Sequence, residues 1–66
     1  MIVNGKELNL DAKTGVSLAG LLDYLKINPS SVAIERNGSI EEREKWELQE
    51  IDETDRIEII KFIGGG

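Results

Sequence analysis

The stretch that decides the fold is DRIEIIKFIGGG, residues 55–66 of a 66-residue chain. β-Branched and aromatic side chains are dense in its first nine residues, and such side chains suit the pleated, half-buried surface of a sheet. We therefore expect a strand over residues 55–63. Successive strand residues point to opposite faces, so we expect Ile57, Ile59 and Ile63 to share the face that packs on the core.

Three glycines, Gly64, Gly65 and Gly66, follow this strand. Glycine has no Cβ and loses more backbone freedom on ordering than any other residue, so we expect residues 1–63 to form one domain and 64–66 a flexible tail. Fully extended, the tail reaches about 10 Å, at about 3.3–3.6 Å per residue. Such a thread suits insertion of the chain end into a narrow active site of another protein. The alternative is a frayed end or a remnant of cloning.

The composition excludes most kinds of active site. There is no Cys and no His, so disulfides, thiolate or imidazole catalysis and zinc sites built on these ligands are excluded. The sequence also lacks the glycine-rich motifs that bind phosphate groups. We expect the carboxylates at positions 41, 42, 44, 47, 50, 52, 53 and 55 to face solvent, and Arg36 and Arg56 to make surface ion pairs of little energetic worth. The chain is therefore expected not to be an enzyme.

The charge distribution is uneven. The formal net charge is −5, and the whole excess of acidic residues lies from Ile34 onward. An acidic surface argues against a nucleic-acid partner, because phosphate binding needs basic residues. No long apolar run or signal-like segment is present, so we expect a cytoplasmic protein that does not bind a membrane. The acidic half either docks on a basic partner or only keeps the protein soluble.

Local signals outline the first half of the fold. Asn4-Gly5 predicts a tight hairpin that joins residues 1–3 to residues 6–10, with Met1, Val3, Leu8 and Leu10 on the core side. Thr14-Gly15 then interrupts the pattern. Ser17 is the expected N-cap of a helix that ends near Leu25, because leucines recur at positions 18, 21, 22 and 25.

The second half predicts strands and turns. We expect a strand over residues 31–36, a tight turn at Asn37-Gly38 and a return through 39–40. Residues 41–50 have high helix propensity, but their apolar residues lie only two positions apart, so we expect a short irregular turn there. We then expect a brief strand near 49–51 and a turn over 52–55. The result is an α+β domain, a mixed β-sheet packed on one main helix. Its first and last strands are expected to lie parallel at the centre, as in a β-grasp fold.

One helix covers only one face of this sheet, which leaves Ile60 and Phe62 on the open face beside the tail. Exposed apolar residues grouped in this way usually mark a protein interface. The alternative is that neighbouring strands cover them in part.

The carboxylate of Gly66 is the one unusual group. An ionised carboxylate does not react with nucleophiles at neutral pH, so a partner has to activate it. Conversion to an acyl adenylate with ATP supplies a good leaving group, and a sulfur nucleophile would then give a thiocarboxylate. Glycines let the tail pass a channel in which any Cβ would clash.

The whole chain resembles the thiamine-biosynthesis sulfur carrier proteins, the ThiS family, which have a ubiquitin-like β-grasp fold. The motifs that carry the resemblance are VNGK at 3–6, the helix over 17–25, IERN at 34–37, RExW at 43–46 and, above all, DRIEIIKFIGGG at 55–66. One departure is Thr54, where the family commonly has a glycine in the turn before Asp55.

The resemblance implies a reaction sequence. An E1-like adenylating enzyme would adenylate Gly66 with ATP and Mg²⁺, which that partner uses, while this chain binds no cofactor itself. Sulfur from cysteine, passed on as a persulfide by a cysteine desulfurase, would convert the terminus to a thiocarboxylate. A thiazole synthase would then take the sulfur to form the thiazole ring of thiamine. By resemblance Gly66 is the modified residue, Gly64 and Gly65 form the threaded tail, and Ile60 and Phe62 belong to the docking face.

Three alternatives stay open. The first is the sulfur carrier subunit of molybdopterin synthase, although those chains are usually longer and often carry prolines just before the glycines. The second is a ubiquitin-like modifier that is conjugated to lysines. The third is a non-catalytic β-grasp interaction module with an inert tail.

If the acidic half docks on a basic partner, the association rate falls as ionic strength rises, because salt screens the attraction that steers the encounter. Stopped-flow binding at several salt concentrations measures this. A rate independent of salt contradicts docking and leaves only the role in solubility.

Overall fold

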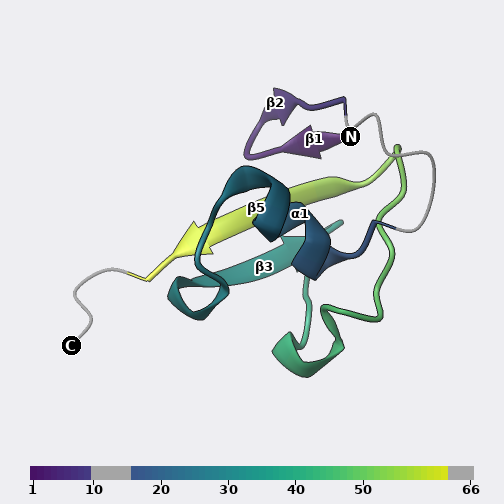
Figure 1. The fold of residues 1–66 in the computed structure, drawn as a ribbon. Coiled ribbons are helices and arrows are strands. Elements are labelled where there is room, and N and C mark those ends of the chain that lie inside the picture. Colours follow the sequence, from purple (N-terminus) through teal and green to yellow (C-terminus); the bar gives the residue numbers. More distant parts are fainter. Residues whose placement is uncertain (10–15, 63–66) are drawn as a thin grey trace.

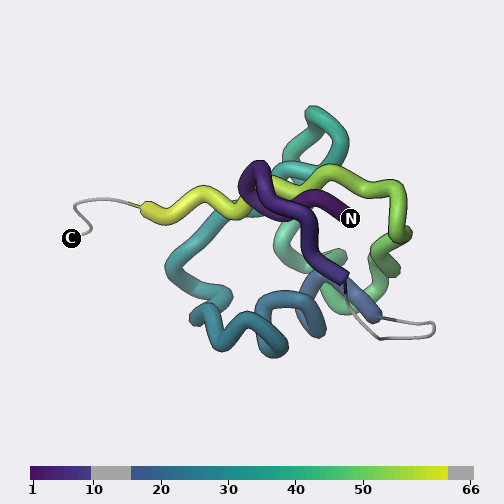
Figure 2. The backbone as a smooth tube through the Cα atoms, turned by 90° about the horizontal axis from the view of Figure 1, so that it is seen from above, coloured from purple at the N-terminus to yellow at the C-terminus, as the bar shows by residue number. Residues whose placement is uncertain are grey.

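The computed structural model of the protein describes residues 1–9 and 16–62. Over these residues a five-stranded sheet packs on one α-helix, and Figure 2 shows the helix on one side of the sheet. The elements, in chain order, are β1 (Ile2–Val3), β2 (Lys6–Glu7), α1 (Leu18–Leu25), the 3₁₀-helix η1 (Pro29–Ser31), β3 (Val32–Arg36), β4 (Ser39–Ile40), the 3₁₀-helix η2 (Arg43–Lys45) and β5 (Arg56–Lys61).

The strand order is β2-β1-β5-β3-β4, with β5 at the centre (Figure 1). β1 and β5 are parallel, and the other neighbours are antiparallel. The predicted α+β class and the parallel central pair are therefore confirmed. The termini of the strands differ from the prediction. Ser31 belongs to η1, which Pro29 begins, and Asp55 lies in the turn before β5, while Ile63 lies outside the described residues.

The first hairpin has the predicted register, with Val3 opposite Lys6. Asn4 and Gly5 both have positive φ, 53° and 81°, as this kind of two-residue turn requires. Asn4 also reaches across to β5: its N–H donates to the carbonyl of Ile57 at 2.9 Å, and its Oδ1 accepts from the N–H of Ile59 at 2.7 Å. The turn therefore holds the central strand as well as the hairpin. Leu10 and the predicted break at Thr14-Gly15 lie outside the described residues.

The helix begins and ends at recognisable caps. Ser17 Oγ accepts from the N–H of Gly20 at 3.0 Å, which confirms Ser17 as the N-cap. After Leu25, Lys26 takes the left-handed conformation and its N–H donates to the carbonyls of Leu22 and Asp23. The apolar stripe faces the sheet: the leucines at 18, 21 and 22 are buried, and Leu25 packs at the edge of the core.

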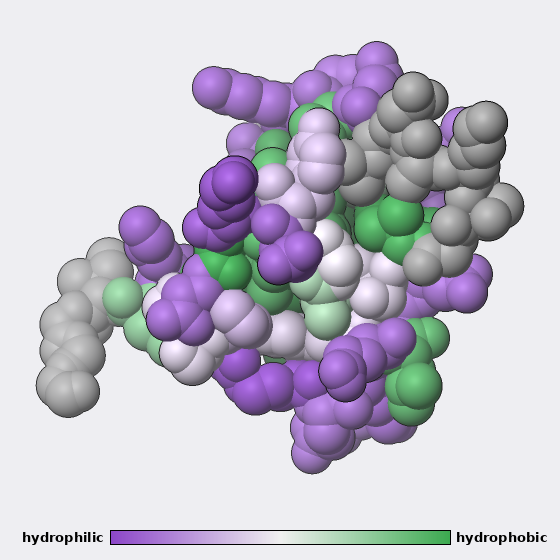
Figure 3. Space-filling model, viewed as in Figure 1, coloured by the Kyte–Doolittle hydropathy of each residue, from purple (hydrophilic) through white to green (hydrophobic). Residues whose placement is uncertain are grey.

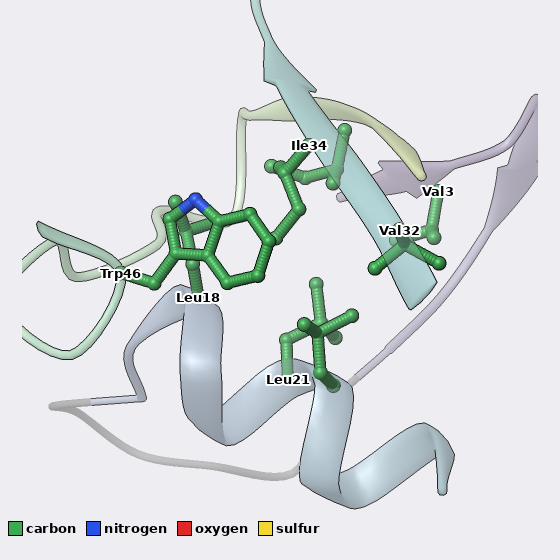
Figure 4. Packing of buried hydrophobic residues seen from close by; sticks show 8 residues of the cluster. Val3, Leu18, Leu21, Val32, Ile34 and Trp46 are labelled. Atoms are coloured by element: carbon green, nitrogen blue, oxygen red, sulfur yellow. The ribbon is translucent and has the colours of Figure 1, made fainter. Parts of the chain in front are cut away.

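Residues 41–50 are irregular as predicted, apart from the short η2, and they cover part of the core through Trp46, but they do not lead into the predicted brief strand. η2 brings the indole of Trp46 between α1 and β3, beside Leu18 and Ile34 (Figure 4). The predicted strand over 49–51 is a single bridge between Ser17 and Glu50, because the chain enters α1 at Leu18 and cannot continue the pairing.

Arg43 fixes this cover in place. Its guanidinium lies 4.5 Å from the centre of the Trp46 ring, and it donates to the carbonyl of Val32 at 2.7 Å and to that of Pro29. The indole Nε1 donates to the carbonyl of Glu41 at 3.1 Å. The polar edge of the tryptophan is therefore satisfied while its ring fills the core.

A polar cluster of Arg36, Asn37, Glu41 and Asp55 joins the β3–β4 hairpin to the start of β5. The Asp55 carboxylate accepts from Asn37 Nδ2 at 3.0 Å and from the N–H of Asp52 at 2.8 Å, and it lies 3.6 Å from Arg36 Nη1. Arg36 Nε also pairs with Glu41 at 3.0 Å. Asp55 is only 8% exposed, so the prediction that it faces solvent is wrong. The expectation for Arg36 is also wrong, because its partly buried guanidinium pairs with two carboxylates, those of Glu41 and Asp55.

The turn before β5 forms with Thr54 at the position where the resemblance led us to expect a glycine. The N–H and Oγ1 of Thr54 both donate to Asp52 Oδ2, the first at 3.0 Å. These hydrogen bonds hold the pKa of Asp52 below its ordinary value of 3.8. Thr54 is not among the residues with positive φ, so a side chain is compatible with this turn.

We expect Asp55→Ala to lower the free energy of unfolding by about 2–3 kcal/mol, because it leaves Asn37 and the Asp52 N–H without an acceptor and Arg36 without one partner. Urea unfolding followed by tryptophan fluorescence measures this. Glu53→Ala, at an exposed position in the same turn, is the control and keeps the midpoint of the unmodified protein. Equal midpoints for the two variants would show that the cluster does not stabilise the fold.

We expect Asn4→Gly to speed hydrogen exchange at the Ile59 amide and to cost about 1 kcal/mol, because glycine keeps the positive φ but removes the acceptor. Asn4→Asp keeps an acceptor at the same place and is the matched control. Exchange measured by NMR separates the two variants. Unchanged exchange at Ile59 in the glycine variant would mean that the Asn4 side chain does not protect β5.

Candidate functional site

The candidate site is the end of β5 that leads toward the glycines. β5 is held along its length by β3, from the pair Arg36–Ile57 to the pair Val32–Lys61, and the N–H of Phe62 extends this ladder by donating to the Ser31 carbonyl at 3.0 Å. Ile57 is fully buried on the helix side. The start of the strand is therefore fixed by the core on one face, whereas the end that leads toward the glycines is held mainly by β3 on one edge.

Ile60 and Phe62 point away from the core. They are 45% and 56% exposed, whereas Ile59, on the helix side, is partly buried against the core. Their sheet neighbours therefore do not cover them, and the alternation predicted from the sequence holds through Phe62. Figure 3 views the molecule from the helix side and shows only a small, weakly hydrophobic region at this end of the strand, beside the grey residues. Their role in binding a partner stays a prediction.

The predicted tail lies outside the described residues. Gly64, Gly65, Gly66 and Ile63 belong to the undescribed 63–66, so the boundary between a domain of 1–63 and a tail of 64–66 is not placed. The last described residue is Phe62, and Figure 2 shows this end of β5 extending beyond the rest of the fold.

One residue that orders the site was missed in the sequence. The Asn-Gly pair signals a hairpin turn, and Asn4 does form that turn, but its side chain also caps the Ile59 N–H, 55 positions later. No local pattern reveals this contact, since it depends on the parallel pairing of the first and last strands.

Other classes of site find little support in the described part of the chain. Among residues 1–9 and 16–62, no group of three or more acidic, histidine or cysteine side chains is arranged to hold a metal ion. The same residues contain no helix of the length and apolar character that crossing a membrane requires.

Comparisons with known proteins agree on one family. The ThiS family model matches residues 1–66. The sulfur carrier protein ThiS of Bacillus subtilis is 34% identical over 64 residues, which are 97% of this chain and 96% of that protein. A crystal structure of the thiamine biosynthesis protein ThiS from Geobacter metallireducens superimposes with a TM-score of 0.85 at 34% identity and covers 98% of this chain and 96% of the other.

Part of a larger enzyme is also similar. A thiazole synthase of Magnetococcus marinus is 41% identical over 64 residues, and this chain spans 19% of its length. A thiazole synthase of Paramagnetospirillum magneticum is 33% identical over 66 residues, and this chain spans 20% of it. The family model, the carrier and the solved structure all match over nearly the whole length, and the fold is the ubiquitin-like β-grasp. The chain therefore belongs to the ThiS family.

Proposed function

We propose that the protein is a sulfur carrier of thiamine biosynthesis whose last residue, Gly66, is converted to a thiocarboxylate. The observation that carries the proposal is the match to a protein named as a sulfur carrier over 97% of this chain and 96% of that one, together with the terminal Gly64-Gly65-Gly66. The chain itself performs no catalysis in this proposal. It presents a carboxylate that partner enzymes modify and then use.

The chemistry follows from the inertness of a carboxylate. An adenylating partner uses ATP and Mg²⁺ to form an acyl adenylate at Gly66 and releases pyrophosphate. The outer sulfur of a persulfide then attacks the acyl carbon and displaces AMP, which gives an acyl disulfide. A thiol of the partner enzyme then attacks the inner sulfur of that disulfide, so that a new disulfide forms and the thiocarboxylate is released. Sulfur from cysteine, delivered through a cysteine desulfurase, is the proposed source, and formation of the thiazole ring is the proposed use.

The exposed pair Ile60 and Phe62 supports a docking role in this cycle. Both side chains lie on the sheet face that α1 does not cover, and Phe62 is two positions before the first glycine in the sequence. Large apolar side chains at the centre of an interface usually contribute most of the binding energy. A partner that holds this face has the chain end within reach.

Two curated thiazole synthases contain a region similar to this whole chain, which supports a thiazole synthase as the acceptor. In such a polypeptide the covalent link keeps the carrier-like region close to the enzyme, so each meets the other at a high effective concentration. The sulfur carrier of molybdopterin synthase is the alternative, and the acceptor that the thiocarboxylate form serves distinguishes the two.

We expect intact mass to increase by the difference between sulfur and oxygen when the protein is incubated with ATP, cysteine, a desulfurase and the adenylating enzyme of the same organism. A variant that lacks Gly66 is the control and keeps its mass. No mass change and no pyrophosphate release, with a partner that is active on another carrier, would refute the proposal.

The docking face is tested in the same assay. Phe62→Ala lowers the rate of pyrophosphate release at subsaturating carrier by about tenfold, because it removes a large anchoring side chain. Tyr24→Ala is the matched control, since Tyr24 is 59% exposed and lies on the helix instead. Equal rates for the two variants would place the docking face elsewhere.

A further inference from the structure

The hydrogen bonds of β5 divide between its two edges. In an antiparallel pair, alternate residues exchange hydrogen bonds with the neighbour, and the residues between them point to the opposite edge. The bonds from Phe62 to Ser31 and from Asn37 to Arg56 show that the backbone groups of Glu58, Ile60 and Phe62 face β3. The backbone groups of Ile57, Ile59 and Lys61 therefore face the edge on which β1 lies.

β1 covers only the first part of that edge. The register of the parallel pair ends at Val3–Ile57. The N–H of Asn4 then donates to the Ile57 carbonyl, and its Oδ1 accepts from the Ile59 N–H. The Ile59 carbonyl and the N–H and carbonyl of Lys61 have no hydrogen-bond partner among residues 1–9 and 16–62. Figure 1 shows β5 continuing past the β1–β2 hairpin on this side. The strand thus offers an open edge over Ile59–Lys61, which ends three positions before the first glycine.

The side chains along this open edge set what can lie beside it. Ile60 is exposed on the face away from the helix, and Lys61 is exposed on the other. Directly opposite residues in neighbouring strands contact one another, so an apolar side chain fits beside Ile60 and an acidic side chain fits beside Lys61.

We propose that an extended segment of the enzyme that accepts the tail adds to β5 as a further strand over Ile59–Lys61, with an apolar residue beside Ile60 and an acidic residue beside Lys61. This inference rests on the proposed function, because it takes the thiazole synthase as that enzyme. Main-chain hydrogen bonds supply affinity in this mode of recognition, and alternate side chains supply specificity. The added strand fixes the direction in which the chain leaves the sheet.

A second copy of the chain fits this edge less well. Each copy carries a net charge of −5, so two copies repel one another. An edge of three residues also offers far less than the area of about 1,000 Å² that a stable interface needs. A partner enzyme meets the area requirement, since it also covers the face of Ile60 and Phe62.

Hydrogen exchange of the full ¹⁵N-labelled chain tests the proposal, with the purified thiazole synthase of the same organism as the probe. Binding is first established by calorimetry with the unlabelled chain. In the complex we expect exchange at the Lys61 amide to slow by about tenfold or more, while the Ile60 amide, already bonded to β3, changes less. Established binding with unchanged exchange at Lys61 overturns the added strand alone, whereas no binding overturns the proposed partner and the inference with it.

A backbone substitution gives a second, independent test. Lys61→Pro removes the N–H that faces the open edge and leaves the β3–β5 hydrogen bonds intact, a position at which strands tolerate proline. We expect affinity to fall by about tenfold or more, because the partner's acceptor is left unpaired. Lys61→Ala keeps the N–H and, by loss of one ion pair, weakens binding by no more than about fivefold.

Equal affinities for these two variants would overturn the added strand. Thermal unfolding of both variants checks that each keeps the fold. If the proline variant does not fold, the hydrogen-exchange measurement still tests the proposal, because it uses the unmodified chain. A second copy of the chain could occupy the edge instead. In that case the Lys61 amide of the free protein would exchange more slowly as the protein concentration rises, and light scattering would detect a dimer. This result would also overturn the proposal.

Discussion

The parallel pairing of β1 with β5 is the constraint on which the rest of the fold depends. It joins residues from the two ends of the chain, and the contact of Asn4 with Ile59 closes a separation of 55 residues. Closing so long a loop costs conformational entropy, and this chain has no disulfide to offset that cost. The compensation comes from burial of Ile57 and its neighbours against α1, and from hydrogen bonds on both edges of β5.

Much of the fold could be predicted because its signals are local. The Asn-Gly turns, the Ser17 cap and the leucine stripe of α1 each depend on residues a few positions apart, and each is found where the sequence placed it. Alternation along β5 likewise predicted the exposure of Ile60 and Phe62. Local signals were therefore sufficient wherever tertiary contacts did not override the local preference.

The main errors arise from contact between segments distant in sequence. Asp55 lies in a charge-rich stretch that is typical of a surface, yet Asn37 and Arg36 from the β3–β4 hairpin surround it. The brief strand expected near 49–51 has only the chain entering α1 as a neighbour. The second role of Asn4 depends on the same kind of contact. For the candidate site, the sequence therefore located the exposed side chains but not the open edge beside them.

The central position of β5 also affects how the chain is made. Protein synthesis proceeds from the N-terminus, so the β1–β2 hairpin, α1 and the β3–β4 hairpin all leave the ribosome before the strand that joins the two hairpins. Until residues 56–61 emerge, neither hairpin has its neighbour in the sheet and the apolar face of α1 has only part of its cover. A nascent chain cut short before β5 thus cannot complete the sheet. Completion of folding therefore waits for β5, the segment that leads toward the glycines.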